Sequence, residues 1–434
     1  MAKGRIVAAI DLGSKYIRCV VAEYSDSSAK PELTTLGVSR VQSKGISNGE
    51  ITDIQEASAS IKQAIKEAEQ EAGAEVRKAY IAVDGINIKK SIHIGSATIQ
   101  DNTITENDKR KANDAVSILA NAKEVRTIQT IPLYYTVDGS EETLSPVGLS
   151  GSRLEFYAMV VQASTAKIEN ISKTIEEIGI ELEEPNGILL STWYAANCIQ
   201  KEILKDDLHD IGVLYLDLGH SITNIAITVN GKIKYCTAIK LGFQDLKKEI
   251  VNRFGIHPND AENLLVNEGL LESVFDINEE ELEQEDAIGY SNDKTINAKS
   301  IASNDTFIQI KKSDFTLAIA DKIYRQLSKS VQASFAIANG QIGLIMITGG
   351  MSMIPGIDKF LRKAFKKEIK ICRERDSKKL PERWETSEYA IAYSVLKAET
   401  EKIEKKKETP AKPDTKTKFK SLYEKIMNFL EEMF

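Results

Sequence analysis

The stretch "RIVAAIDLGSKYIRCVVAE", residues 5–23, returns in altered form as "VLYLDLGHSITNIAITVNG", residues 213–231. In both copies an apolar run ends in Asp-Leu-Gly, a few polar residues follow, and a second apolar run begins. Each copy predicts two paired β-strands with Asp-Leu-Gly at the turn between them. Because the copies lie far apart in the chain, we predict two related halves.

An Asp-x-Gly turn of this kind suits a nucleoside triphosphate. Glycine lets the backbone approach the phosphates and present its N–H groups to them, and a following Ser adds a hydroxyl donor. The aspartate would be repelled by phosphate oxygens, so we expect it to face a hydrated Mg²⁺ or a water. One such turn is common in hairpins. Two of them predict halves that hold one phosphate chain, with ATP and Mg²⁺ as ligands.

A third element, Thr348-Gly349-Gly350, follows the apolar run "LIMI". Its glycines would let the backbone lie flat against a ribose or an adenine. A strand that ends in Gly-Gly is by itself more often a tight turn. After two phosphate turns in this order, it favours a nucleotide site.

Length and composition set broad limits. A chain of 434 residues predicts at least two lobes, and its net charge of −7 argues against nucleic acid as a partner. The four cysteines and four histidines show no metal-ligand or redox spacing. We see no signal peptide and no apolar stretch of transmembrane length, so we expect a cytosolic location.

The two Asp-Leu-Gly turns and the Thr348-Gly349-Gly350 element are together the signature of the actin/Hsp70/sugar-kinase superfamily. Within it, the chain resembles the FtsA family of bacterial cell-division proteins from about Arg5 to Glu399. The most specific stretches are "GISNGEITDIQEASASIKQAIKEAE", "IPLYYTVDGSEETLSPVGLSGSRLE" and "ITGGMSMIPGI". The resemblance implies an α/β, actin-like (ribonuclease H-like, duplicated) two-lobed ATPase fold. It also implies an inserted β-α-β-β subdomain and a C-terminal amphipathic helix.

The expected organisation follows from this resemblance and from the pattern of the sequence. We place the first lobe at 1–86 and 164–209, interrupted by an inserted subdomain at 87–163. The second lobe has a large subdomain at 210–243 and 313–385 and a small one at 244–312. A closing helix at 386–399, a disordered linker at 400–418 and an amphipathic membrane-targeting helix at 419–434 complete the chain.

The resemblance also implies a function. It suggests ATP in the central cleft, polymerisation into filaments, and recruitment of the tubulin-like protein FtsZ and other division proteins to the septum. The protein would lie peripherally on the cytoplasmic side of the cell membrane. Asp11 and Asp217 would hold Mg²⁺ through water. The expected nucleotide-binding residues are Asp11, Gly13, Ser14, Lys15, Asp217, Gly219, His220, Ser221, Glu262, Thr348, Gly349, Gly350 and Met351.

Three departures from the family pattern concern hydrolysis. Much of the family has Asp-x-Gly-x-Gly-Thr-Thr-Asp at the second turn, where this chain has Ser221 for a glycine and Asn224 for an acid. The family's Ala-Glu-x-x-Lys keeps its Glu here as Glu262, but Leu265 takes the place of the Lys. We therefore expect nucleotide binding with weak or absent ATPase activity and name no catalytic residue.

The last segment, "FKSLYEKIMNFLEEMF" at 419–434, separates its apolar and polar residues when projected at helical spacing. Such a short helix is marginal in water by itself, so its apolar face needs a partner. Docking on the body of the protein or on a protein groove is one interpretation, and an in-plane helix on an anionic membrane surface is the other. We favour the membrane. The apolar face comprises Phe419, Leu422, Tyr423, Ile426, Met427, Phe429, Leu430, Met433 and Phe434.

Other functions of the same fold remain open at this point. A pilus-assembly ATP-binding protein would share the inserted subdomain but would usually lack the membrane tail. A small-molecule kinase would need a second substrate pocket with a catalytic acid, and it would have no use for a linker with an amphipathic end. A chaperone of the Hsp70 type is least expected, because no substrate-binding domain follows the body.

Overall fold

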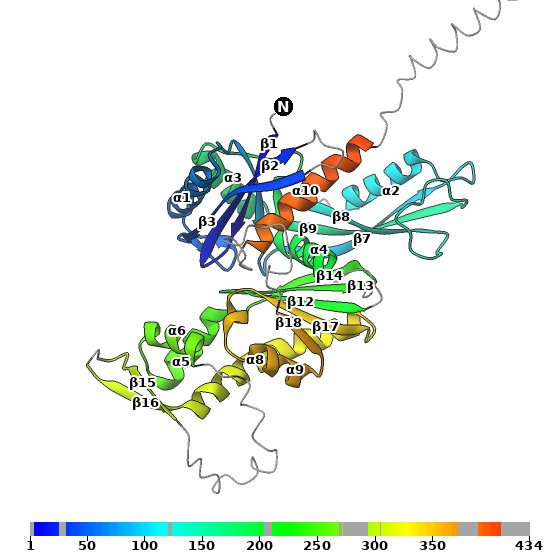
Figure 1. Cartoon of the computed structure of the whole chain (residues 1–434). Helices are drawn as coiled ribbons and strands as arrows, with labels where there is room; N and C mark the ends of the chain where they lie inside the picture. The colour runs from blue at the N-terminus through cyan, green and yellow to red at the C-terminus, as the bar shows by residue number, and fades with distance from the viewer. Residues whose placement is uncertain are drawn as a thin grey trace, which may run out of the picture.

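The computed structural model describes residues 4–25, 32–119, 124–203, 211–268, 271, 294–303, 305–371 and 389–408. Two lobes lie one above the other in Figure 1, and the inserted subdomain projects from the upper lobe. Within these residues, no helix is both long and apolar enough to cross a membrane.

Lobe one is built on a mixed sheet in the order β10-β6-β1-β2-β3, with β11 also paired to β6. Helices α1 and α3 pack on one face of this sheet, and α4 and α10 pack on the other (Figure 1). The strands are β1 (Arg5–Leu12), β2 (Tyr16–Ser25), β3 (Glu32–Gln42), β6 (Lys78–Val83), β10 (Glu181–Leu182) and β11 (Ile188–Leu190), beside the short hairpin β4 (Ile46–Ser47) and β5 (Glu50–Ile51). The helices are α1 (Ile54–Ala72), α3 (Thr165–Glu177), α4 (Ser191–Ile203) and α10 (Ala390–Glu408).

Lobe two repeats this arrangement. Its sheet runs β14-β13-β12-β17-β18, so that β12 has a parallel neighbour on one side and an antiparallel meander on the other, as β1 has in lobe one. Its strands are β12 (Gly212–Leu218), β13 (Thr223–Val229), β14 (Lys232–Ile239), β17 (Ile342–Thr348) and β18 (Glu368–Ile371), with a separate hairpin of β15 (Thr295–Lys299) and β16 (Phe307–Lys311). The helices are α5 (Phe243–Phe254), α6 (Pro258–Asn267), α8 (Lys312–Ile337) and α9 (Ile357–Phe365), with the 3-10 turn η3 (Gly350–Met353).

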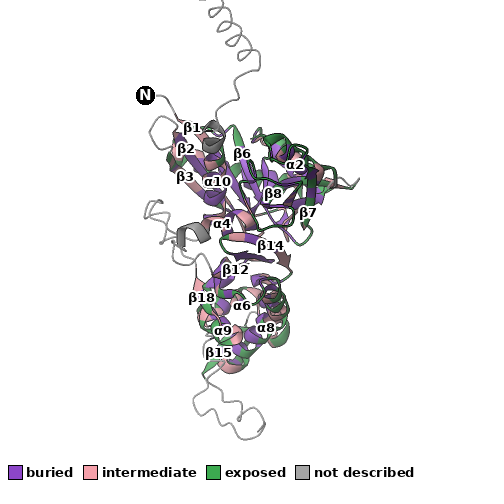
Figure 2. Cartoon of the chain, turned by 90° about the vertical axis from the view of Figure 1, so that its right-hand side faces the viewer, coloured by how far each residue is buried: buried purple, intermediate pink, exposed green. Residues whose placement is uncertain are grey.

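Side-chain alternation along the central strands explains why both faces of each sheet are covered. Successive residues of a strand point to opposite faces. Along β12, Leu214 and Leu216 belong to the core under α5 and α8, whereas Val213 and Tyr215 belong to the core shared with lobe one. Almost all residues of β12 and β13 are buried (Figure 2), which explains their continuous apolar character in the sequence.

The inserted subdomain confirms the predicted β-α-β-β order. It consists of β7 (Lys89–Thr98), α2 (Glu106–Leu119), β8 (Val125–Val137) and β9 (Arg153–Ser164), in the sheet order β7-β9-β8. Helix α2 covers one face of this sheet, and Ala112 and Val116 on that helix pack with Leu154 and Phe156 of β9. The insert therefore has a core of its own.

Local signals predicted some elements well. Helix α1 begins after Asp53, whose side chain accepts a hydrogen bond from the Glu56 backbone N–H at 2.9 Å. It ends at Gly73, which has the left-handed φ of 61° that favours glycine at this position. The apolar residues of this helix, which recur at helical spacing, are buried against the sheet.

Three elements differ from expectation. Strand β18 and the hairpin β15–β16 were not predicted, because each strand is only four or five residues long and gives a weak signal in the sequence. Helix α10 continues to Glu408, beyond its predicted end at Glu399. Lys and Glu favour helix, so a segment poor in large apolar residues can still continue one that is already formed. The acidic run "NEEELEQED" at 278–286, the rest of the linker and the segment 419–434 lie outside the described residues.

Candidate functional site

The two Asp-Leu-Gly turns lie at equivalent ends of the two central strands. Asp11 on β1 is opposite Arg18 on β2, and Asp217 on β12 is opposite Asn224 on β13. Each aspartate thus has its cross-strand partner at the same spacing. The duplication predicted from the sequence therefore extends to the strand register.

Glycine is required at both turns for the same reason. A Cβ at Gly13 would lie 2.5 Å from the carbonyl oxygen of Tyr16, and a Cβ at Gly219 would lie 2.6 Å from that of Ile222. In both turns the obstructing carbonyl belongs to the third residue after the glycine. Any side chain here would force the backbone of the turn to move.

The partners of the two aspartates differ in charge. Arg18 Nη1 lies 3.6 Å from Asp11 Oδ2, whereas Asn224 Nδ2 donates to Asp217 Oδ2 at 3.0 Å. An acid at position 224 would place a second carboxylate against Asp217. Asn224 instead donates a hydrogen bond, and its own Oδ1 is buried with no protein partner.

Both aspartates are buried, and this determines their proton affinity. Burial raises the pKa of Asp11 to about 6; Arg18 opposes the shift, and the charges of Asp217 and Asp84 add to it. Burial also raises the pKa of Asp217, against hydrogen bonds from Asn224 and Thr348. Because burial makes the ionised form of these carboxylates unfavourable, a nearby cation would stabilise that form strongly.

The third predicted element adjoins Asp217. Thr348 lies opposite Asp217 in the parallel pair β12–β17, and a Cβ at Gly349 would lie 2.6 Å from Asp217 Oδ1. Gly349 has a φ of 84°, and Gly350 faces open space. Met351 is fully buried in the lobe-two core, so its side chain cannot reach a ligand in the cleft.

Lobe one has an equivalent of this element that sequence reasoning missed. Asp11 lies opposite Ala82 in the parallel pair β1–β6, as Asp217 lies opposite Thr348. Two residues further on, lobe one has Asp84 where lobe two has Gly350. The signal was present as "AVDG" at the end of a strand, but only the sheet order gives it meaning.

Asp84 is a fully hydrogen-bonded, buried carboxylate. Its Oδ1 accepts from Gly85 N at 2.9 Å and from Lys90 Nζ at 2.7 Å. Its Oδ2 accepts from Ser191 Oγ and Thr192 N, both at 3.2 Å, and from the Thr192 hydroxyl. Asp84 therefore links β6, the first strand of the insert and the N-terminus of α4, where a negative charge is favourable.

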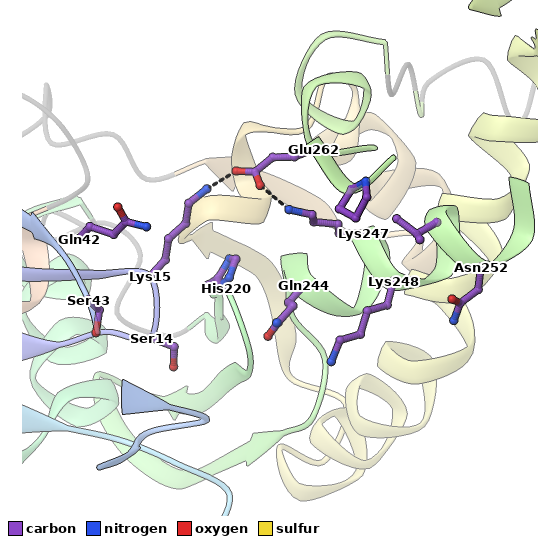
Figure 3. A pocket seen from close by; sticks show the side chains of 12 residues that line it. Ser14, Lys15, Gln42, Ser43, His220, Gln244, Lys247, Lys248, Asn252 and Glu262 are labelled. Carbon is purple, nitrogen blue, oxygen red and sulfur yellow. Dashed lines mark hydrogen bonds and ion pairs between the residues drawn. The ribbon is translucent and has the colours of Figure 1, made fainter. Parts of the chain in front are cut away.

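An open pocket of about 350 Å³ lies beside the turns, between the lobes (Figure 3). Lys15 Nζ and Lys247 Nζ each lie 2.8 Å from an oxygen of Glu262, so the glutamate connects the two lobes. Hydrogen bonds from Lys15 and Lys247 lower the pKa of Glu262 to about 2. The lining residues are Ser14, Lys15, Gln42, Ser43, His220, Gln244, Lys247, Lys248, Val251, Asn252, Pro258 and Glu262.

The pocket carries an excess of positive charge, because three lysines face one glutamate. His220 adds a hydrogen-bonding ring that stacks on Phe243, with ring centroids 6.1 Å apart. Burial lowers the pKa of His220, so the imidazole is neutral at physiological pH. Its Nδ1 is buried without a protein partner, so the ring has hydrogen-bonding capacity to offer a ligand.

The predicted site residues thus fall into three groups. Ser14, Lys15, His220 and Glu262 line the pocket. Asp11, Gly13, Asp217, Gly219, Thr348, Gly349 and Gly350 form the turns and strand ends next to it, and Ser221 is buried in the second turn. Met351 belongs to the core, and the predicted membrane-binding residues lie outside the described part of the chain.

Sequence reasoning missed Lys247 as well. It supplies the positive charge next to Glu262 that Leu265 cannot provide, but it comes from α5 rather than from the glutamate's own helix α6. Only the packing of α5 against α6 brings the two together.

The donors fit a hydrated Mg²⁺. Within the described residues, no cluster of three or more His, Cys, Asp or Glu side chains is arranged to hold a metal by protein ligands alone. Mg²⁺ typically uses one or two carboxylates together with waters and substrate phosphates. The buried pair Asp11 and Asp217, whose pKa values are raised, provides such a set.

Comparison with known proteins identifies relatives over most of the chain. The sequence model described as "Cell division protein FtsA" matches residues 214–394, and "SHS2 domain inserted in FTSA" matches residues 85–162. Cell division protein FtsA of Bacillus subtilis is 26% identical over 375 residues, covering 86% of this chain and 79% of the relative. FtsA of Escherichia coli is 22% identical over 368 residues, covering 85% and 84% respectively.

Solved structures support the same fold. A structure described as a "PilM-PilN type IV pilus biogenesis complex" superposes with a TM-score of 0.60 at 15% identity, covering 90% of this chain and 98% of that one. At this identity the match shows the fold alone. The two family models together match more than half of the residues, and with its duplicated lobes and insert the chain belongs to the FtsA family of actin-like cell-division proteins.

Proposed function

We propose that this chain binds ATP with Mg²⁺, polymerises on the cytoplasmic face of the cell membrane and tethers FtsZ filaments there during septum formation. The observation that carries the nucleotide part is the pair of equivalent turns, with Asp11 and Asp217 both buried and the charge of Asp217 close enough to raise the pKa of Asp11. A bound Mg²⁺ would neutralise both these carboxylates and the phosphates.

The phosphate chain would lie along the turns, where Gly13 and Gly219 let the backbone N–H groups come close. Lys15 and the neutral His220 would face it from the pocket. Glu262 points into the same pocket and can accept hydrogen bonds from ribose hydroxyls. Each of these groups is supplied by a different lobe or element, so the nucleotide would hold the lobes together.

Hydrolysis is expected to be weak or absent. It requires a base or a polar group that positions water at the γ-phosphate. Asp84 is near the two turn aspartates, but both of its oxygens already accept hydrogen bonds from protein donors. Asn224 is bound to Asp217 and carries no charge. A slow ATPase suits a protein whose nucleotide state controls assembly.

The membrane and FtsZ parts of the proposal depend on family membership and on the segment 419–434. Apolar insertion of several large side chains, each worth about 1.5–3 kcal/mol when fully buried, would allow reversible binding. Polymerisation would then make attachment firm through multivalency. The small subdomain at 244–312 would face FtsZ.

Co-sedimentation tests this proposal. The full chain should pellet with anionic phospholipid vesicles, and FtsZ should enter the pellet only when the chain is present, more strongly with ATP and Mg²⁺. Gly13→Arg should block ATP binding, because its side chain would enter the first turn. Failure of FtsZ to pellet at low salt would contradict the tether, and normal ATP affinity in Gly13→Arg would contradict the placement of the nucleotide.

A further inference from the structure

The inserted subdomain of lobe one also touches lobe two. Glu142, in the connection between β8 and β9, accepts hydrogen bonds from Lys232 Nζ at 3.2 Å and Lys234 Nζ at 2.6 Å. Both lysines lie on β14. The position of Glu142 is fixed by its neighbour Thr143, whose backbone exchanges hydrogen bonds of 2.8 and 2.9 Å with Tyr135.

An aromatic pair completes this contact. Lys234 Nζ lies 4.8 Å from the ring centroid of Tyr134, which stacks on Tyr157 with centroids 4.5 Å apart. The ammonium of Lys234 is therefore held between a carboxylate and an aromatic face, which strengthens the contact beyond a simple surface ion pair. We call Glu142, Lys232, Lys234 and Tyr134 the insert clamp.

Beneath the insert clamp the two lobes share one apolar core. Tyr215, Ile233 and Cys236 of lobe two belong to the same buried cluster as Ile131 and Met159 of the insert. Separating the lobes on this side would expose apolar surface, at about 25 cal/mol per Å². Separating the lobes on this side is therefore unfavourable in free energy.

The cleft side is held differently. Its cross-lobe ion pair, Lys15–Glu262, is about one-third exposed on both side chains, as the pairs of the insert clamp are, and Lys15 Nζ lies 5.4 Å from the ring centroid of Phe243. The difference is the apolar core shared by the two lobes, which lies beneath the insert clamp. An ion pair at such exposure exchanges readily with water or with another anion. In the view of Figure 1, α5 and α6 lie to the left and the insert to the right, so the weak and the strong contacts lie on opposite sides of the junction.

We propose that the inserted subdomain carries the hinge between the lobes. Lobe two rotates about the insert clamp. The cleft opens when the Lys15–Glu262 ion pair, which we call the latch, breaks, and it closes when the pair forms. The insert then determines how far the cleft opens, in addition to exposing a surface of its own. A nucleotide that takes Lys15 from Glu262 would replace this ion pair as the link between the lobes, without loosening the hinge. Of the tests below, only the measurement of ATP binding rests on the proposed nucleotide site.

Hydrogen exchange and X-ray scattering on the full chain test the hinge without any ligand. Glu142→Lys places three positive charges together, so the backbone amides of β14 should exchange about two- to tenfold faster, as expected for the loss of two partly exposed ion pairs. The radius of gyration should rise as the lobes sample more open angles. Adding Lys234→Glu to Glu142→Lys restores an opposite-charge pair and should return both values toward wild type.

Two further variants sharpen the comparison. Arg325→Glu breaks the exposed Asp321–Arg325 pair on α8 of lobe two and should leave β14 exchange and the radius of gyration unchanged. Glu262→Gln should raise the radius of gyration while leaving β14 protected. Unchanged β14 exchange in Glu142→Lys, or no recovery in the charge swap, would overturn the hinge.

Measuring ATP binding distinguishes the hinge proposal from the nucleotide-site proposal. If the wild type binds ATP, Glu142→Lys should weaken that binding about two- to tenfold. If the wild type binds no ATP, the nucleotide proposal fails, while exchange and scattering still decide the hinge. Tight ATP binding that Glu142→Lys leaves unchanged would show that the hinge does not govern the cleft.

Discussion

Asp11 illustrates how a buried acid makes stability depend on pH. Its pKa is raised from 3.8 to about 6, so between these values the folded state holds more protons than the unfolded state. The free energy of unfolding therefore falls as pH rises through this window and stays lower above it. Asp11→Asn should stabilise the ligand-free protein by about 1–3 kcal/mol at pH 8 and lose that advantage below about pH 4.

Denaturant titrations at both pH values measure this effect. Asp321→Asn on the exposed face of α8 is the control and should show no comparable pH dependence. A variant Asp11→Asn that is less stable than wild type at pH 8 would mean that Arg18 compensates the burial of the carboxylate.

The turn glycines make a second prediction for single residues. Gly219→Ala would put a Cβ 2.6 Å from the Ile222 carbonyl oxygen, whereas Gly350→Ala would meet nothing within 4 Å. Overpacking against the backbone should destabilise the first variant by about 1–3 kcal/mol. The second should stay within about 1 kcal/mol of wild type. Thermal unfolding compares them, and equal melting temperatures would show that the second turn is more plastic than its geometry implies.

Helices α4 and α10 meet at a buried tyrosine. The Tyr194 hydroxyl donates to Glu399 and accepts from Gln129 Nε2 at 3.0 Å and from Lys402 Nζ at 3.2 Å. Tyr194→Phe leaves these groups without their shared partner and should cost about 1–3 kcal/mol of unfolding free energy. The control is Tyr324→Phe on α8, which is 45% exposed and should change stability by less than about 0.5 kcal/mol. Equal effects in urea titrations would argue that water replaces the hydroxyl at α10.

Elements whose signals are local could be predicted, and those defined by distant partners could not. Helix α1 has its cap, its apolar face and its terminal glycine within one segment, so its signals are all local. The two Asp-Leu-Gly turns were found because they repeat. Asp84 and Lys247 could not be predicted as site residues, because their neighbours come from β1 and α6. Only the sheet order and the helix packing bring them to the cleft.

At the scale of the whole molecule, the proposed tether depends on the segment that follows α10. Phe429 lies on the apolar face predicted for 419–434, and its neighbour Asn428 lies on the polar face. If the segment lies in the membrane plane, Phe429→Glu puts a charge among the acyl chains and should abolish sedimentation with anionic vesicles. Asn428→Glu adds the same charge on the water-facing side and should weaken binding only modestly, through repulsion from anionic lipid. Both variants should keep the ATP affinity and melting temperature of the wild type. Equal vesicle binding by the two variants would show that an inserted helix face does not hold the protein at the membrane.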